Sequence, residues 1–112
     1  MINVDNSAMN DNTNSTTPLS YEVVFSVFKK RGTLEIFRLI SDKPLRFTDI
    51  QHQIELPPRT LSLRLAELTK LGLVERTQYD VIPPKVEYSL NEKGKLLLKE
   101  IETNISWISS NL

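Results

Sequence analysis

Residues 73–90 read LVERTQYDVIPPKVEYSL, and this stretch decides what kind of fold the chain can adopt. Two runs rich in Val, Ile and Tyr, residues that favour strands, flank the adjacent prolines Pro83 and Pro84. Proline cannot donate a hydrogen bond to a neighbouring strand, so the strands must stop at the prolines and resume after them. Apolar and polar residues alternate over 86–90, which predicts one buried and one solvated face. The stretch therefore predicts a β-hairpin with a stiff tip.

Helical periodicity describes most of the chain before this hairpin. Apolar residues recur at helical spacing over 19–30, where Gly32 breaks the pattern, and again over 33–41, where Pro44 ends it. Residues 45–47 form a short extended segment. The chain therefore opens with two helices and a short strand.

Two shorter signals predict a helix pair next. Thr48 is expected to cap a helix of about two turns, with Gln51 completing a capping box, and this helix should end near Leu56. Pro58 suits the first turn of the following helix, which Gly72 should stop. That second helix has the clearest apolar stripe in the chain, formed by Leu61, Leu65 and Leu68.

After the hairpin, Asn91 is expected to cap a final helix that has Glu92 in its first turn. The resulting order is helix, helix, short strand, helix, helix, hairpin, helix. This order predicts a mainly α fold with a small β-hairpin wing, that is, a winged helix-turn-helix in a single domain over 19–112. Residues 1–18 are Asn-rich with few large apolar groups, so we expect a disordered tail.

Composition excludes several classes of function. The 112 residues include no Cys and one His, His52, so we expect no thiolate nucleophile, no metal site and no cofactor. No Ser/His/Asp set, paired carboxylates or Gly-rich phosphate loop stands at usable spacing, so an enzyme is not expected. No apolar run is long enough to span a bilayer and the first residues do not resemble a signal peptide, which predicts a cytoplasmic protein without a membrane partner. Fourteen Lys and Arg balance fourteen Asp and Glu, so net charge alone does not indicate nucleic acid.

The stretch LVERTQYDVIPPKVEYSLNEKG, over 73–94, resembles the wing of the HxlR family of bacterial and archaeal transcription regulators. That family has a Gly-Leu-Val-Glu-Arg start, a Val-Pro-Pro tip and a Val-Glu-Tyr-Ser-Leu return strand. The preceding PLRFTDIQHQIELPPRTLSLRLAEL is similar to its helix-turn-helix, so the resemblance covers about residues 44–95. It implies a DNA-binding transcription regulator, most often a repressor.

Two positions depart from the family pattern. The family's first helix usually opens with Cys-Pro-x-Glu, and counting back from Glu22 places Leu19 where that Cys stands. Any signal must therefore act without thiol chemistry. The family's Gly-Gly-Lys-Trp turn between the first two helices is replaced by Lys-Lys-Arg-Gly over 29–32, which changes the packing expected at that turn.

With Leu65 at the centre of the buried face of the second helix-turn-helix helix, 100° per residue turns Arg59 and Leu63 outward. The first two turns of such a helix meet base edges in the major groove. We expect Arg59 to pair with guanine, Ser62 to bond either base type and Leu63 to touch a thymine methyl group. The predicted DNA-contact set, which adds phosphate and backbone contacts, is Thr48, Arg59, Thr60, Ser62, Leu63, Arg64, Arg76 and Lys85.

From Gly94 onward, apolar residues recur at alternating intervals of three and four, the pattern of a coiled-coil seam. The seam runs about 27 Å, further than the core of so small a domain extends. It therefore predicts a homodimer that forms through this helix, with help from the first helix, on an inverted-repeat operator. The predicted interface is Leu98, Ile101, Ile105, Trp107, Ile108 and Leu112.

An alternative stays open at this point. A winged-helix module that binds another protein and not DNA would also fit a chain with no net charge. Acidic residues on the DNA-reading helix would favour that alternative, but positions 57–66 hold Arg59 and Arg64 and no acid.

Overall fold

The computed structural model describes residues 20–111, with only the backbone described at Tyr21. The predicted tail and Leu19 lie outside this range. Along the described residues the elements are α2 (Tyr21–Phe28), α3 (Thr33–Asp42), α4 (Phe47–Gln53), α5 (Pro58–Lys70), β1 (Val74–Tyr79), β2 (Lys85–Leu90) and α6 (Glu92–Asn111). The order is the predicted one, and it is that of a winged helix-turn-helix.

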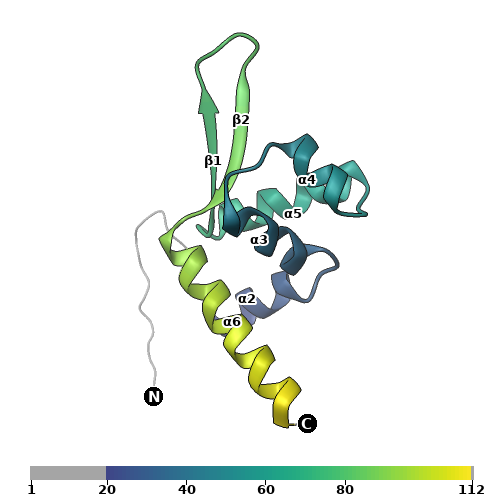
Figure 1. The fold of residues 1–112 in the computed structure, drawn as a ribbon, viewed down its shortest axis with the longest axis vertical. Coiled ribbons are helices and arrows are strands. Elements are labelled where there is room, and N and C mark those ends of the chain that lie inside the picture. The colour runs from purple at the N-terminus through teal and green to yellow at the C-terminus, as the bar shows by residue number, and fades with distance from the viewer. Residues whose placement is uncertain (1–19, 112) are drawn as a thin grey trace.

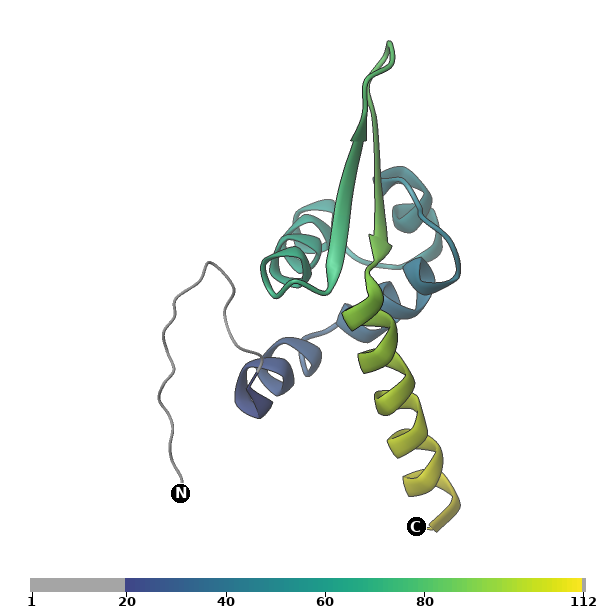
Figure 2. The ribbon, with the colours of Figure 1, turned by 90° about the vertical axis from the view of Figure 1, so that its left-hand side faces the viewer.

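Helices α2 to α5 form the body, from which the β1–β2 hairpin and the end of α6 project in opposite directions (Figures 1 and 2). The core lies among α3, α5 and the base of the hairpin. Its largest fully buried side chains include Phe37, Ile36 and Leu65, and the ring of Phe28 packs edge-on against that of Phe37 at 4.9 Å. Ile36 of α3 is completely buried.

The start of α4 differs from the prediction, which placed Thr48 at the cap. The helix begins at Phe47, and the Asp49 carboxylate accepts the backbone N–H of Arg46 at 3.2 Å. Leu45, just before, is held extended by two backbone hydrogen bonds with Tyr88 of β2, at 3.0 and 2.8 Å. Because the bridge holds only Leu45 extended, the helix can begin two residues later, at Phe47. A helix capped by Thr48 would begin at Asp49, so Thr48 lies inside the first turn and does not cap it.

The end of α4 also differs. The helix stops at Gln53, and Ile54 is extended, although the sequence predicted helix to about Leu56. The residue before a proline is disfavoured in a helix, and here the extended segment turns Leu56 into the core, where it is 8% exposed. The next helix follows the prediction, with Pro58 in its first turn and Leu61, Leu65 and Leu68 buried.

The two strands pair antiparallel, with Val74 opposite Leu90 at the base and Tyr79 opposite Lys85 near the tip. The prolines lie in the connection, as predicted. Burial of one face is not sustained along β2, because only Leu90 is buried and the other residues are half-buried on both faces. The reason is that the outer half of the hairpin projects beyond the helices of the described body (Figure 2).

The base of α6 is joined to the hairpin by a cap and a close approach. The Asn91 side chain accepts the Gly94 backbone N–H at 2.8 Å and donates to the Gly72 carbonyl at 2.6 Å, so the predicted cap is confirmed. A Cβ at Gly94 would overlap the Leu73 carbonyl oxygen, so only glycine lets α6 start this close to β1. Among the described residues, no helix is long and apolar enough to cross a membrane.

Candidate nucleic-acid interface

The first two turns of α5 present a solvent-facing surface of three side chains. Arg59, Ser62 and Leu63 are exposed there, Leu63 at 53%, while Thr60 is half-buried at the edge. Arg59 forms no ion pair with any residue that the structure describes. The predicted outward face of this helix is therefore present, with a guanidinium available to an outside acceptor.

Arg64 does not join this surface. Its Nε donates to the Arg31 carbonyl at 3.1 Å, its Nη1 lies 3.5 Å from a Glu67 carboxylate oxygen, and only 16% of the side chain is exposed. The expected phosphate contact is thus replaced by an internal contact, because the turn between α2 and α3 lies against this side of α5. Lys30 of the same turn also pairs with Glu67. Together these contacts fasten α5 to the turn.

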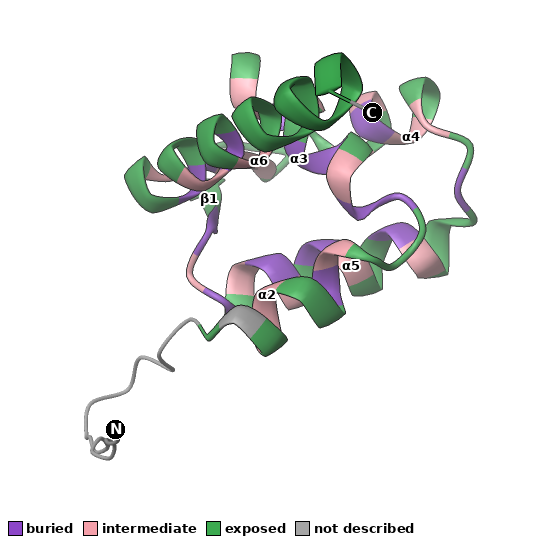
Figure 3. Ribbon diagram, turned by 90° about the horizontal axis from the view of Figure 1, so that it is seen from below, coloured by how far each residue is buried: buried purple, intermediate pink, exposed green. Residues whose placement is uncertain are grey.

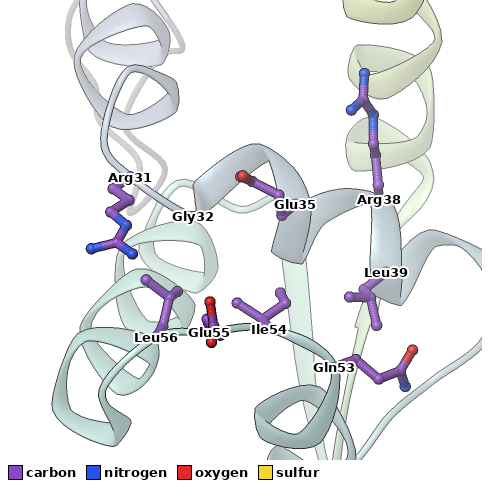
Figure 4. Close-up of a pocket in the computed structure, with 9 residues that line it drawn as sticks. All are labelled: Arg31, Gly32, Glu35, Arg38, Leu39, Gln53, Ile54, Glu55 and Leu56. Atoms are coloured by element: carbon purple, nitrogen blue, oxygen red, sulfur yellow. The ribbon is translucent and has the colours of Figure 1, made fainter.

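A pocket of about 570 Å³ lies between this turn, α3 and the segment that joins α4 to α5 (Figure 4). Gly32 forms part of one wall and has φ +89°, and a Cβ added there would overlap Leu56 on the other wall. Glu35 and Glu55 are also in the lining, and Arg38 turns away to pair with Glu102 of α6 at 2.9 Å. The turn thus packs directly against the helix-turn-helix, and no sequence signal indicated this pocket.

The cations of the hairpin have different surroundings. Arg76 on β1 is exposed and forms no ion pair with a described residue, so its guanidinium is available to an outside acceptor. Lys85 is the first residue of β2, just after the hairpin tip. Its Nζ lies 3.4 Å from a Glu87 carboxylate oxygen and 4.9 Å from the centroid of the Tyr79 ring, so it is turned back along the hairpin.

Tyr79 completes this cluster on the hairpin. Its hydroxyl donates to the Glu87 carboxylate at 3.0 Å. That hydrogen bond, the nearby negative charge and slight desolvation raise the pKa of the Tyr79 phenol above its usual value. The phenol therefore stays protonated and keeps its hydrogen bond to Glu87 to higher pH. Thr48 is exposed in the first turn of α4, as a contact to an outside group requires.

The predicted seam of α6 divides into two parts. Leu98 is 7% exposed and belongs to the chain's own core, so it is not available to a partner as predicted. Ile101, Ile105 and Ile108 instead face an apolar groove of about 490 Å³ with Phe25 and Leu34 on its other sides. Most of α6 beyond Ile101 is exposed, as Figure 3 shows from below.

The two remaining interface residues lie elsewhere. Trp107 is 63% exposed and does not line the groove, because 100° per residue separates it from Ile108 around α6. Leu112 lies outside the described residues. The groove is therefore built by Ile101, Ile105 and Ile108, with α2 as its opposite wall.

Comparison with known proteins decides the family. The family model described as HxlR-like helix-turn-helix matches residues 27–112. The chain belongs to the HxlR-like family. The resemblance seen in the wing and the helix-turn-helix is thereby confirmed, and the family consists of transcriptional regulators.

Individual relatives of this HxlR-like protein are also named as regulators. It is 44% identical over 92 residues to an HTH-type transcriptional regulator of Halalkalibacterium halodurans, covering 81% of this chain and 80% of the relative. The reduced form of the transcriptional regulator YodB of Bacillus subtilis superposes with a TM-score of 0.74 at 33% identity, over 80% of this chain and 89% of that one. The redox regulator HypR in its oxidised form superposes with a TM-score of 0.70 at 33% identity, over 81% and 95%.

Proposed function

We propose that this protein is a sequence-specific, double-stranded DNA-binding transcriptional repressor. The observation that carries the proposal is the exposed face of the first two turns of α5. Arg59, Ser62 and Leu63 offer there a guanidinium, a hydroxyl and an apolar group at the end of the helix that meets base edges in a helix-turn-helix. No acidic residue from 57 to 66 opposes the phosphates.

The proposed phosphate contacts are Thr48 on α4, Thr60 at the edge of α5 and Arg76 on β1. Arg64 supports the proposal indirectly, because it fastens α5 to the body and fixes the angle at which Arg59 is presented. Lys85 reaches a phosphate only if it leaves Glu87, so its contribution is smaller than that of Arg76.

The proposal includes a homodimer that forms through α6 and α2. The groove between them is apolar, and Ile105 and Ile108 remain 38% and 47% exposed in the single chain. A second copy related by a two-fold axis would bury these side chains and set two reading helices about 34 Å apart, one turn of DNA. The operator would then be an inverted repeat.

Fragments selected from native genomic DNA by the purified protein supply the operator for the test. Arg59→Ala should weaken its binding by about 1–3 kcal/mol and relax the preference at one base position. The control Lys99→Ala removes the same charge from an exposed position on α6 and should leave binding unchanged. Unchanged affinity and preference in Arg59→Ala would remove the proposed role of α5.

A protein that selects no fragment, or binds DNA independently of salt, would point to the protein-binding alternative. DNA binding through phosphates must weaken as salt rises, because each contact releases counterions. The protein-binding alternative is retained because fourteen basic and fourteen acidic residues leave the chain with no net positive charge to attract DNA.

A further inference from the structure

The tip of the hairpin carries an apolar side chain that is not packed against the described part of the chain. Ile82 is fully exposed and the neighbouring Val81 is 51% exposed. Both stand beyond the last paired residues, Tyr79 and Lys85, at the part of the molecule furthest from α6 (Figure 1). Isolated exposed apolar residues are common, but a fully exposed isoleucine at the end of a projecting hairpin is well placed to contact another molecule.

The tip offers little positive charge. Between positions 79 and 85 the charged residues are Asp80 and Lys85, and Lys85 is held against Glu87 and the ring of Tyr79. Asp80 would be repelled by a phosphate. A contact made by the tip must therefore depend on Ile82, Val81 and the two prolines, which present carbon surface.

The contacts among Tyr79, Lys85 and Glu87, at the last paired residues before the tip (the neck), hold the tip in one direction. The hydrogen bond from Tyr79 of β1 to Glu87 of β2 joins the two strands. Lys85, which pairs with Glu87 within β2, also lies over the Tyr79 ring, with its Nζ 4.9 Å from the ring centroid. Proline at positions 83 and 84 further restricts the connection, since its ring fixes φ. Such a tip loses little conformational entropy when it is placed against a surface.

The length of the hairpin indicates which surface of the DNA its tip can contact. Each strand has six residues from base to neck, about 17 Å at about 3.4 Å per step. One turn of DNA is about 34 Å, so half a turn separates the centre of the major groove from the adjacent minor groove by about 17 Å. An isolated protein partner is disfavoured, because stable protein interfaces bury about 800 Å² on each side, far more than two side chains supply.

We propose that Ile82 enters the minor groove beside each half-site and packs on its sugar walls, wedging against a base step without a phosphate contact. This inference rests on the proposed DNA binding. Isoleucine and proline are among the residues that proteins insert into this groove. The contact favours sequences that deform easily, such as pyrimidine–purine steps, so Ile82 contributes sequence preference at a position where no base is hydrogen-bonded.

The test compares Ile82→Ala with the native protein on the selected operator over a range of salt concentrations. Removing three carbon atoms from the contact should weaken binding by about ten- to fiftyfold. The slope of log Kd against log salt should not change, because no phosphate contact is lost. Arg76→Ala gives the opposite signature, a shallower slope. Leu96→Ala removes an exposed apolar side chain from α6 and should alter neither quantity.

A second readout locates the contact. With 2-aminopurine at the base step under the tip, the native protein should raise the fluorescence by unstacking the base, and Ile82→Ala should not. Since Ile82 is fully exposed, this variant should unfold at the same temperature as the native protein, which separates lost contact from lost structure.

Three results would overturn the inference. Native affinity in Ile82→Ala excludes the wedge, and a shallower salt slope in that variant shows that the tip acts by placing a cation. If the native protein binds no DNA, the proposed function fails together with the wedge. If the native protein binds and Ile82→Ala binds equally well, only the wedge fails.

Discussion

At the scale of the residue, Arg59 and Arg64 show that the surroundings of a side chain decide its role. Both lie on α5, five positions apart. Arg59 stands in the first turn with no described ion partner, whereas Arg64 meets a carbonyl of the α2–α3 turn and a carboxylate of its own helix. One arginine is left to bind an outside acceptor and the other fixes the helix that carries it.

Gly32 combines a positive φ with a close approach to another side chain, so replacing it should cost stability in two ways. Gly32→Ala places a side chain at φ +89°, which costs about 1–2 kcal/mol. The new Cβ also overlaps Leu56, and such overpacking costs about 1–3 kcal/mol more. We expect the free energy of unfolding in urea to fall by the sum of both effects.

Gly72 provides the matched control, because it has φ +77° but a Cβ added there would meet no other atom within 4 Å. Gly72→Ala should therefore show the backbone cost alone. Equal losses in the two variants would mean that the contact between Gly32 and Leu56 does not limit the packing of the turn.

At the scale of the element, α6 has two halves with different surroundings. Its first turns are packed on the base of the hairpin, with Gly94 and Leu98 buried, and its second half is exposed apart from the groove. Arg38 of α3 reaches Glu102 at the boundary between the halves. The first half thus belongs to the domain, and the second is the part offered to a partner.

The cap of α6 gives a prediction at this scale. Asn91→Ala removes the acceptor of the Gly94 N–H and the donor to the Gly72 carbonyl, so the free energy of unfolding should fall by about 1–2 kcal/mol. Thermal or urea unfolding measures it. Asn111→Ala makes the same chemical change at the end of α6, where the amide donates to the Trp107 carbonyl at 2.8 Å, and should change stability by about 0.5 kcal/mol or less. A similar loss in both variants would contradict the role of the cap.

At the scale of the whole molecule, the groove between α2 and α6 leads to a prediction on assembly. Ile108→Asp puts a carboxylate into the proposed interface, where burying it unpaired costs about 2 kcal/mol or more. We expect the dimer dissociation constant, measured by analytical ultracentrifugation, to rise about thirtyfold or more. Operator binding should weaken in parallel.

Ser106→Asp is the matched control for this charge. Ser106 lies with Lys99 and Thr103 on another side of α6, away from the groove, and is exposed. Its replacement should leave assembly unchanged. A native protein that stays monomeric at tens of micromolar would contradict the proposed dimer.

The absence of Cys from the sequence gives a second prediction for the whole molecule. A disulfide-forming oxidant such as diamide should leave operator binding intact, because the chain has no thiol to oxidise. Operator binding before and after treatment, measured by fluorescence anisotropy, checks this. Loss of binding that a dithiol reverses would contradict it.

Local patterns in the sequence determined most of the elements. The hairpin and its proline connection, the stop at Gly72, Pro58 at the start of α5 and the Asn91 cap each depend on residues a few positions apart, so they are readable from the sequence. The outward face of α5 follows in the same way from 100° per residue. The family resemblance rests on such local stretches too.

Only the tertiary structure decided which of these residues are left exposed to bind another molecule and which are used in contacts within the chain. Arg64 and Arg31 are 33 positions apart, and Arg38 and Glu102 are 64 apart. The start of α4 depends on a bridge to Tyr88 of β2, and the assignment of Leu98 to the core depends on where α6 meets α3. Periodicity places a side chain on a face of its own helix, but the element that covers this face comes from elsewhere in the chain. For this reason the core and the exposed seam of α6 could be separated only in three dimensions.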